Sequence, residues 1–119
     1  IRSTGNNDVL ITERGTTFGY DRLVVDMTGI PEMKKTGAKV IIDATHSVQR
    51  PSTGGKKTGG NRGDVKIIAK CGIAAGADGL FAETHFAPET SPSDSENIYE
   101  LDKIEGLLKK VLDFFTILH

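Results

Sequence analysis

The strongest indication of the fold is in residues 39–49, which read KVIIDATHSVQ. The β-branched run Val40-Ile41-Ile42 predicts a strand that is buried on both faces, as the strands of a parallel sheet are. Polar residues follow it closely, and these are Asp43, Thr45, His46 and Gln49. Because the loops after the carboxyl ends of parallel strands converge, this stretch predicts a strand that delivers a histidine to a functional site. The alternative is a strand that ends in a surface histidine with ordinary hydrogen-bond partners.

Two other short apolar runs also end in charged residues. Residues 9–11 lead into Glu13 and Arg14, and residues 77–82 lead into Glu83. Both runs predict strands of the same kind as the first. The three strand ends then share one pattern, an apolar run that turns abruptly polar.

Helices are predicted after each of these strands. The first has Pro31 in its first turn and ends at Gly37. The second runs from an N-cap at Asp64 to about Ala75. The third covers residues 102–118, where apolar side chains recur at helical spacing. Three strand–helix units in series predict a parallel sheet with right-handed crossovers.

The composition is that of one small domain. The chain has 119 residues, 26% of them charged, with a net charge of −1, so nothing predicts a nucleic acid or an anionic membrane as partner. No apolar run approaches the length of a membrane span, and the first residues lack the layout of a signal peptide. The single cysteine, Cys71, excludes an internal disulfide and fits a reducing compartment.

The segments between these elements are predicted to be loops. Residues 16–22 form one loop, and residues 23–25 form either a short strand or a packed turn. Residues 50–63 contain five glycines with Lys56, Lys57 and Arg62, so they predict a long exposed loop that closes over an anionic substrate as a mobile lid. Its glycine spacing matches neither a Walker nor a dinucleotide fingerprint.

The three strand ends are expected to bring distant residues together. Neighbouring parallel strands lie about 5 Å apart, so Arg14, His46 and Glu83 should converge on one rim of the sheet. Arg14 offers a permanently charged fork for phosphate or carboxylate, or else forms an internal ion pair with Glu13 or Asp43.

A metal site is one interpretation of the same rim. His46, Glu83 and Asp94 supply one nitrogen and two carboxylate ligands, a set that suits a divalent metal with open positions. The alternative is that all three are solvated loop groups. His85 is either a partner of a ligand or an exposed residue. Cys71 falls within the second helix, where we expect a small core residue.

Three motifs resemble the 3-deoxy-D-manno-octulosonate 8-phosphate synthase family. They are residues 12–26, residues 43–49 together with the Gly59-Gly60-x-Arg62 loop end, and residues 79–85. The correspondence is almost continuous over residues 9–112. The family fold is a (β/α)8 barrel of the class I aldolase and DAHP synthetase type. The resemblance implies that residues 1–119 are the carboxyl-terminal part of that single domain, its last three βα units. A complete barrel needs about 250 residues, so we expect a part of a longer chain.

The resemblance implies an enzyme, a carbon–carbon bond-forming transferase of lipopolysaccharide biosynthesis. It would condense phosphoenolpyruvate with D-arabinose 5-phosphate to give the octulosonate phosphate and free phosphate. By this resemblance Arg14, Gln49, Thr58 and His46 bind substrate, and His46 and Asp94 are catalytic. The family's metal ligands correspond to His46, Glu83 and Asp94, so a divalent Mn, Zn or Fe ion is the implied cofactor. The family further implies a cytoplasmic homotetramer.

Two other functions remain open at this point. One is the related synthase that uses erythrose 4-phosphate to begin aromatic biosynthesis, although residues 16–20 resemble that family less. The other is a catalytically silent fragment that only binds phosphate or a partner chain. We expect the isolated 119-residue chain to be inactive, because the remaining phosphate contacts of the family lie on strands outside it.

Overall fold

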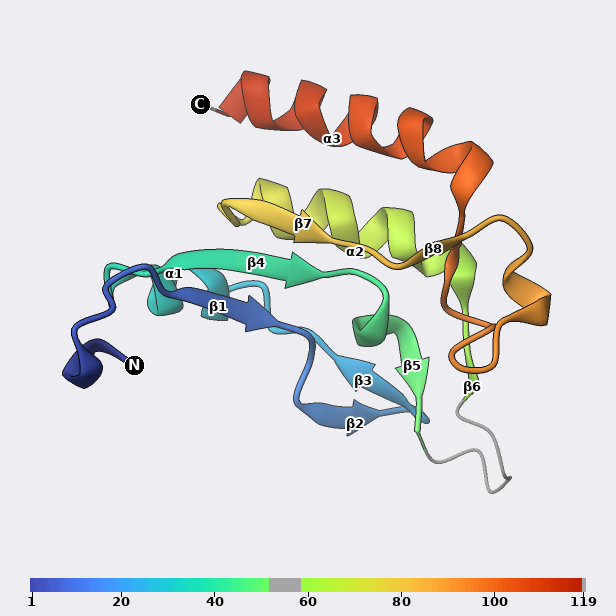
Figure 1. The fold of residues 1–119 in the computed structure, drawn as a ribbon, viewed down its shortest axis with the longest axis horizontal. Helices are drawn as coiled ribbons and strands as arrows, with labels where there is room; N and C mark the ends of the chain where they lie inside the picture. Colours follow the sequence, from blue (N-terminus) through green and yellow to red (C-terminus); the bar gives the residue numbers. More distant parts are fainter. Residues whose placement is uncertain (52–58, 119) are drawn as a thin grey trace.

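Three parallel strands form the centre of the structure, a computed structural model that describes residues 1–51 and 59–118 (Figure 1). The strands are β1 (Leu10–Glu13), β4 (Lys39–Asp43) and β7 (Gly79–Phe81), in the sheet order β1-β4-β7. Ile41 lies opposite Thr12 on one side and Gly79 on the other. The parallel sheet predicted from the sequence is confirmed, and its three carboxyl ends lie at one edge.

A helix follows each of these strands along the chain. The helices are α1 (Gly29–Lys34), α2 (Arg62–Ala74) and α3 (Ile104–Leu118). Figure 1 shows α2 and α3 side by side on the same side of the sheet. The predicted order of three strand–helix units is therefore confirmed.

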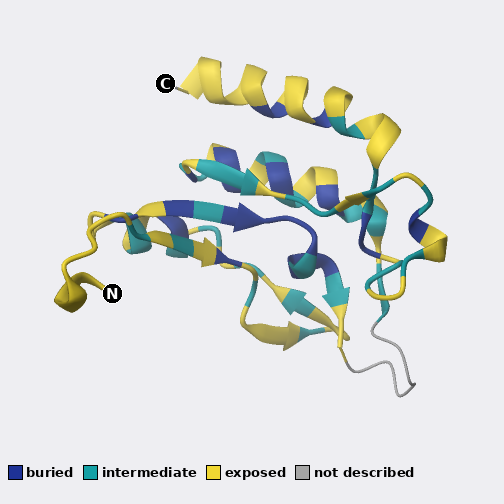
Figure 2. Cartoon of the chain, in the orientation of Figure 1, coloured by how far each residue is buried: buried dark blue, intermediate teal, exposed yellow. Residues whose placement is uncertain are grey.

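The core lies between the sheet and its helices. Val40 and Ile42 are fully buried against residues of α1 and α2, and burial of each contributes about 1.5–3 kcal/mol (Figure 2). Gly72 allows α2 to approach the sheet closely, because a Cβ at this position would lie 2.6 Å from Cγ1 of Ile42. The packing of the second helix therefore depends on a residue without a side chain.

The opposite face of the sheet is covered much less. Ile41 is half-buried, and Leu10 and Phe81 are 63% and 42% exposed. The prediction that the central strand is buried on both faces is wrong for the described residues. Successive side chains of a strand point to opposite faces, and the three described α-helices cover only the face that carries Val40 and Ile42.

The remaining elements are short. The strands are β2 (Thr17–Gly19) with β3 (Arg22–Val24), β5 (Gln49–Arg50) with β6 (Gly59–Gly60), and β8 (Thr84–His85) with β9 (Tyr99–Glu100). The 3-10 helices are η1 (Arg2–Thr4), η2 (His46–Val48), η3 (Pro88–Thr90) and η4 (Leu101–Lys103). The pair β5–β6 closes the base of the segment predicted as a lid, whose residues 52–58 lie outside the described ranges.

The β2–β3 pair corrects the prediction of a loop over residues 16–22. It is an antiparallel hairpin whose turn places Tyr20 and Asp21 at φ 51° and 68°. Two-residue hairpin turns need positive φ values, which Asn and Gly adopt most easily. Tyr and Asp give no such signal in the sequence.

Two details of α2 also differ from prediction. Its N-cap is Asn61 rather than Asp64, because the Asn61 side chain accepts a hydrogen bond from the backbone N–H of Gly63 at 3.1 Å. Cys71 is exposed rather than part of the core. The buried side of α2 instead carries Val65, Ala69, Gly72 and Ile73.

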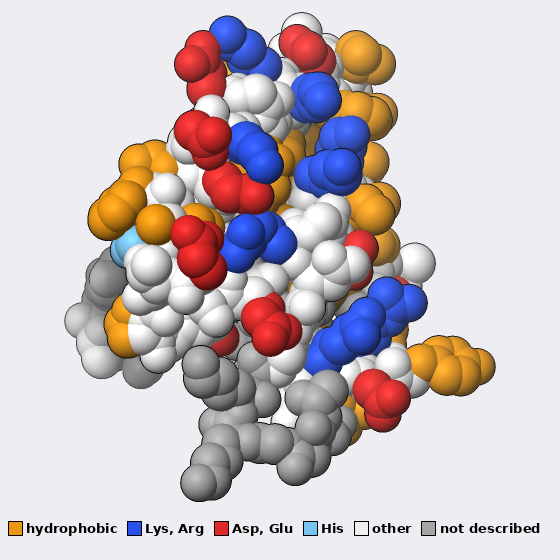
Figure 3. All heavy atoms as spheres, turned by 90° about the vertical axis from the view of Figure 1, so that its right-hand side faces the viewer, with side chains coloured by type: hydrophobic (Ala, Val, Ile, Leu, Met, Phe, Trp, Pro, Cys, Tyr) orange, Lys and Arg blue, Asp and Glu red, His pale blue; other side chains and the backbone are white. Residues whose placement is uncertain are grey.

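The surface has mixed charge. Figure 3 shows lysine and arginine side chains interspersed with acidic ones on the face that carries the ends of α2 and α3. Ion pairs such as Lys103–Glu100 at 2.9 Å and Lys109–Glu105 at 2.6 Å contribute to this mixture. Among the described helices, none is both long and apolar enough to cross a membrane.

Candidate functional site

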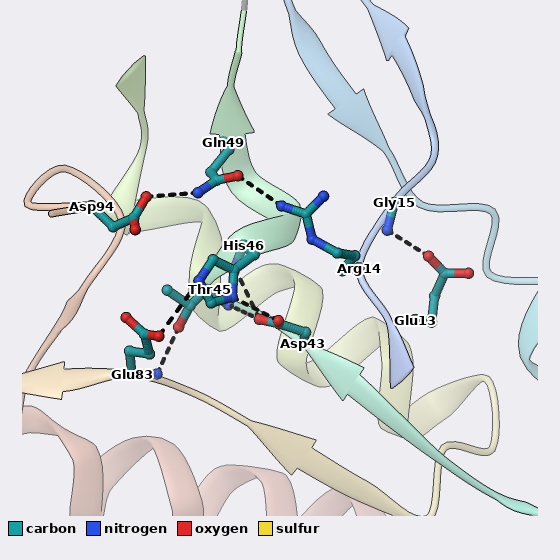
Figure 4. A network of polar contacts seen from close by, with 9 residues as sticks. All are labelled: Glu13, Arg14, Gly15, Asp43, Thr45, His46, Gln49, Glu83 and Asp94. Atoms are coloured by element: carbon teal, nitrogen blue, oxygen red, sulfur yellow. Dashed lines mark hydrogen bonds and ion pairs between the residues drawn. The ribbon is translucent and has the colours of Figure 1, made fainter. Parts of the chain in front are cut away.

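A network of polar side chains lies at the carboxyl ends of β1, β4 and β7 (Figure 4). Arg14 directly follows β1, Asp43 ends β4, and Glu83 lies between β7 and β8. His46 begins η2, and Asp94 comes from the loop before β9. The sheet thus brings together residues that are up to 80 positions apart in the chain, Arg14 and Asp94.

His46, Glu83 and Asp94 form a group that could hold a metal ion. Each offers one ligand atom, and these atoms all lie within 4.8 Å of one another. Nε2 of His46 lies 3.5 Å from Oε1 of Glu83. All three residues are partly buried, and their donor set of one imidazole nitrogen and two carboxylates suits a divalent cation such as Mn²⁺, Zn²⁺ or Fe²⁺. The residues therefore fit the predicted metal.

Asp43 fixes the orientation of the histidine. Its Oδ2 lies 2.7 Å from Nδ1 of His46, and its Oδ1 accepts hydrogen bonds from the backbone N–H groups of Thr45 and His46. The imidazole also stacks on Phe81, with the ring centroids 5.9 Å apart. A hydrogen on Nδ1 that is donated to Asp43 leaves the Nε2 lone pair directed toward Glu83.

Thr45 holds the backbone of Glu83 in place. The Thr45 hydroxyl is fully buried and accepts a hydrogen bond from the Glu83 N–H at 2.8 Å. On its other side, the Glu83 carbonyl accepts a hydrogen bond from the N–H of Tyr99 at 2.9 Å. The backbone of Glu83 is thus fixed both from the N-cap of η2 and from β9.

Asp94 is held by its own turn and by Gln49. It has φ 50°, a left-handed conformation that Asp tolerates better than most residues, and its carbonyl accepts the N–H groups of Asn97 and Ile98. Nε2 of Gln49 donates a hydrogen bond to Oδ1 of Asp94 at 2.6 Å. The side chain is therefore directed toward His46 and Glu83.

Arg14 forms none of the internal ion pairs considered in the sequence. The buried Glu13 accepts a hydrogen bond from the N–H of Gly15 at 2.5 Å instead, and Asp43 is paired with His46. Nη2 of Arg14 donates to Oε1 of Gln49 at 2.8 Å, and the residue is exposed. This exposed guanidinium lies beside the group of His46, Glu83 and Asp94, and within the described residues Gln49 takes up one of its five N–H donors.

The other predicted residues are placed differently. Thr58, Lys56 and Lys57 lie outside the described residues. Arg62 donates to the carbonyl of Ser95 at 2.6 Å, which ties α2 to the loop that carries Asp94. Nδ1 of His85 accepts a hydrogen bond from the N–H of Ala87, and its ring stacks on Phe86. No described hydrogen bond or ring contact joins His85 to the candidate metal ligands.

Sequence reasoning missed the positioning roles of Asp43 and Thr45. A signal for Asp43 was present, because a carboxylate three positions before a histidine in a tight turn can reach its ring. Thr45 had no such signal, since its partner Glu83 is 38 positions away.

A parallel α/β sheet with an exposed arginine and a candidate metal group at its carboxyl edge is an arrangement found in barrel enzymes. The sequence profile of the DAHP synthetase I family matches residues 1–119. The chain belongs to the DAHP synthetase I family.

Curated relatives agree with the resemblance read from the sequence. The chain is 46% identical to the 2-dehydro-3-deoxyphosphooctonate aldolase of Bartonella bacilliformis, over 96% of this chain and 40% of the relative. The proteins of the same name from Chelativorans sp. and Brucella ovis are 47% and 49% identical, each over 98% of this chain and 42% of the relative. That name is a synonym of 3-deoxy-D-manno-octulosonate 8-phosphate synthase, so the predicted resemblance is confirmed. The chain spans about two fifths of the length of these relatives.

The fold also matches a solved structure. The crystal structure of the DAHP synthase of Thermotoga maritima superimposes with a TM-score of 0.82 at 25% sequence identity. The match covers 98% of this chain and 32% of that one. The predicted fold is confirmed: the chain forms three strand–helix units of a (β/α)8 barrel.

Proposed function

We propose that the protein containing these residues condenses phosphoenolpyruvate with D-arabinose 5-phosphate and water, giving 3-deoxy-D-manno-octulosonate 8-phosphate and phosphate. The observation that carries the proposal is the position of Arg14, an exposed guanidinium held beside the group of His46, Glu83 and Asp94. The identities of 46–49% to curated relatives of that activity support this substrate pair over the erythrose 4-phosphate reaction.

Arg14 is the proposed contact of the phosphoenolpyruvate phosphate. Its planar fork matches phosphate oxygens in a way that an ammonium does not. Gln49 holds one of its nitrogens and leaves the remaining donors for the substrate. The positive charge offsets part of the negative charge that two phosphates and a carboxylate bring into the site.

His46, Glu83 and Asp94 are the proposed ligands of a divalent metal. When bound, such an ion supplies Lewis acidity that orients and polarises an oxygen of the aldehyde or of the attacking water. Asp43 keeps Nε2 of His46 directed toward the site, and Thr45 keeps Glu83 in place. His46 and Asp94 also lie where they can orient substrate and exchange a proton with it.

Phosphate release by the full-length protein tests the proposal. Release should require both phosphoenolpyruvate and arabinose 5-phosphate, and mass spectrometry should detect the eight-carbon product. Erythrose 4-phosphate in place of the pentose should react at least tenfold more slowly. Equal or faster turnover with erythrose 4-phosphate would assign the aromatic pathway instead, and no turnover with either sugar would overturn the proposal.

Chelation tests the metal separately. Activity should disappear when the full-length protein is treated with a chelator and return with Mn²⁺, Zn²⁺ or Fe²⁺. Full activity without any metal detectable by elemental analysis would leave His46 and Asp94 only substrate-orienting and proton-transfer roles. Residues 1–119 alone should give no turnover above a heat-treated control, because the remaining phosphate contacts implied by the resemblance lie on strands outside these residues.

The resemblance extends the proposal to the setting of the enzyme. We propose a cytoplasmic enzyme, as the resemblance implies, and the single cysteine is compatible with that compartment. A homotetramer is the assembly implied by the resemblance, and size-exclusion chromatography with light scattering would measure it.

A further inference from the structure

Gln49 connects the two halves of the candidate site. Its carboxamide accepts a hydrogen bond from Nη2 of Arg14 at 2.8 Å and donates one to Oδ1 of Asp94 at 2.6 Å (Figure 4). It is partly buried in β5, between the strand end that carries Arg14 and the loop that carries Asp94. Among the described residues, it is the only side chain with hydrogen bonds to both Arg14 and one of the three candidate ligands.

The chemistry of the two neighbours fixes the direction of this amide. A guanidinium only donates hydrogen bonds and an ionised carboxylate only accepts them, so the amide oxygen must face Arg14 and the NH₂ must face Asp94. A glutamate at this position would pair with Arg14 but repel Asp94. A methionine would have similar length and would form neither bond. The bridge therefore requires a neutral group with an acceptor and a donor at the reach of glutamine.

The two hydrogen bonds of Gln49 leave other atoms of Arg14 and Asp94 available to ligands within the described structure. The described structure gives the Arg14 guanidinium one hydrogen bond, to Gln49, and four of its five N–H donors are available to an anion. Gln49 occupies Oδ1 of Asp94, and the carboxylate keeps its second oxygen for a cation. An anion on Arg14 and a cation on Asp94 are thus compatible with the same bridge.

We propose that Gln49 is a positioning residue that couples the binding of a phosphate monoester at Arg14 to the binding of a divalent cation at Asp94. An anion that orders Arg14 also orders the Gln49 amide, which then holds Asp94 in the orientation that faces His46 and Glu83. The cation consequently binds a carboxylate whose freedom is already restricted, so the two ligands favour each other. This inference rests on the proposed function, because it takes phosphoenolpyruvate as the anion.

The contacts of Asp43 and Thr45 provide an internal comparison. Asp43 orients His46 and Thr45 fixes the backbone of Glu83, but neither contacts Arg14. Both should affect the affinity for the cation alone. Only Gln49 should affect how strongly the anion changes that affinity.

The test is calorimetric titration of Mn²⁺ into the metal-free, full-length protein, with and without saturating phosphoenolpyruvate and without sugar. The measured quantity is the coupling factor, the ratio of the two Mn²⁺ dissociation constants, corrected for Mn²⁺ bound by phosphoenolpyruvate in protein-free buffer. We expect a factor of about five or more for the unchanged protein. Gln49→Met should weaken each ligand when it binds alone and, in addition, lower the coupling factor to less than half, and Gln49→Glu should also lower the factor.

Thr45→Val is the matched control, expected to weaken Mn²⁺ binding while preserving the coupling factor. Thermal denaturation of each variant identifies any that fails to fold, and Gln49→Glu, which is isosteric, then replaces Gln49→Met. A coupling factor in the folded Gln49 variant equal to that of the unchanged protein would overturn the inference alone. Absence of phosphoenolpyruvate binding to the unchanged protein would overturn the proposed function and this inference with it.

Discussion

The two ends of the same sheet use charge in opposite ways. At the amino ends, Lys34 donates to Oδ1 of Asp78 and to the carbonyl of Gly76, both at 2.8 Å, and Oδ2 of Asp78 accepts the N–H of Val40 at 2.9 Å. The charges there neutralise each other and tie α1 to β4 and β7. At the carboxyl ends, Glu83 and Asp94 approach each other around His46 without a lysine or arginine bound directly to either in the described contacts.

This difference assigns stability to the amino edge of the sheet and ligand binding to its carboxyl edge. Two neighbouring carboxylates repel each other, so their arrangement is unfavourable unless a cation joins them. The ion pair at the amino ends has no such cost. Changes at the carboxyl edge should therefore alter binding and hardly alter folding, and changes at the amino edge should do the reverse.

The largest effect is expected from Glu83→Gln. This change removes one ligand charge without changing the shape of the side chain. The affinity for Mn²⁺ should fall on the order of a hundredfold, about 2.7 kcal/mol. The unfolding free energy of the metal-free protein should stay within about 0.5 kcal/mol, because the side chain is exposed enough to lose little packing. Calorimetry and urea unfolding measure the two quantities, and a variant that binds Mn²⁺ normally would contradict the ligand assignment.

Asp43→Asn should come next. An amide facing Nδ1 of His46 favours the imidazole tautomer in which Nε2 carries the hydrogen, and that nitrogen then cannot bind a metal. We expect at least a tenfold loss of Mn²⁺ affinity. Loss of activity with unchanged Mn²⁺ affinity would mean that Asp43 does not act through His46.

Arg14→Lys should raise the KM for phosphoenolpyruvate about tenfold, roughly 1.4 kcal/mol. The ammonium keeps the charge but loses the fork that matches phosphate. The KM for arabinose 5-phosphate serves as the reference, because it should change much less. An unchanged KM for phosphoenolpyruvate would remove Arg14 from the substrate site.

Asp78→Asn should have the smallest effect, and it should lower the stability of the fold rather than the binding of ligands. The Lys34 ammonium and the Val40 N–H hold the pKa of Asp78 below its ordinary value of 3.8. A lowered pKa in the folded state means that the ionised group stabilises the fold above about pH 4, and that this contribution disappears as the pH falls through the folded pKa. Because both side chains are about one third exposed, we expect a loss of about 1 kcal/mol or less at pH 7.

Urea unfolding of Asp78→Asn and the unchanged protein at pH 7 and at about pH 3 measures this term. The difference between the two proteins should shrink at the lower pH, while their Mn²⁺ affinities at pH 7 agree within twofold. A constant difference at both pH values would show that the charge of Asp78 does not stabilise the fold.

The parts of the structure that sequence reasoning recovered are those with a strong local signal. The run Val40-Ile41-Ile42 and the helical spacing of residues 104–118 predicted elements that the structure contains. The convergence of His46 and Glu83 followed from the parallel topology alone. The metal and substrate roles of these residues stay predictions, because they depend on ligands rather than on the fold.

The features that were missed depend on unusual local chemistry or on distant contacts. The hairpin turn at Tyr20 and Asp21 lacks the Asn-Gly signal, although the β2–β3 pairing still forms. Asn61 replaced Asp64 as the N-cap because either side chain suits the role, and only the backbone conformation decides between them. Gln49 was assigned to substrate binding by resemblance, whereas its contacts with Arg14 and Asp94 became apparent only in three dimensions.

The register of the sheet also has a consequence for how the molecule folds. Leu10 pairs with Lys39 and Ile41 pairs with Gly79, so neighbouring strands are separated by 29 and 38 positions of chain. Contacts of such high contact order form slowly, since long loops must close before any strand pairing stabilises them. The side chains of Arg14, His46 and Glu83 lie just beyond these paired strands, so we expect them to come together only after the strand pairs have formed. During synthesis β1 leaves the ribosome 29 positions ahead of its partner residues in β4, so the pairing of these two strands has to wait until the intervening chain is made.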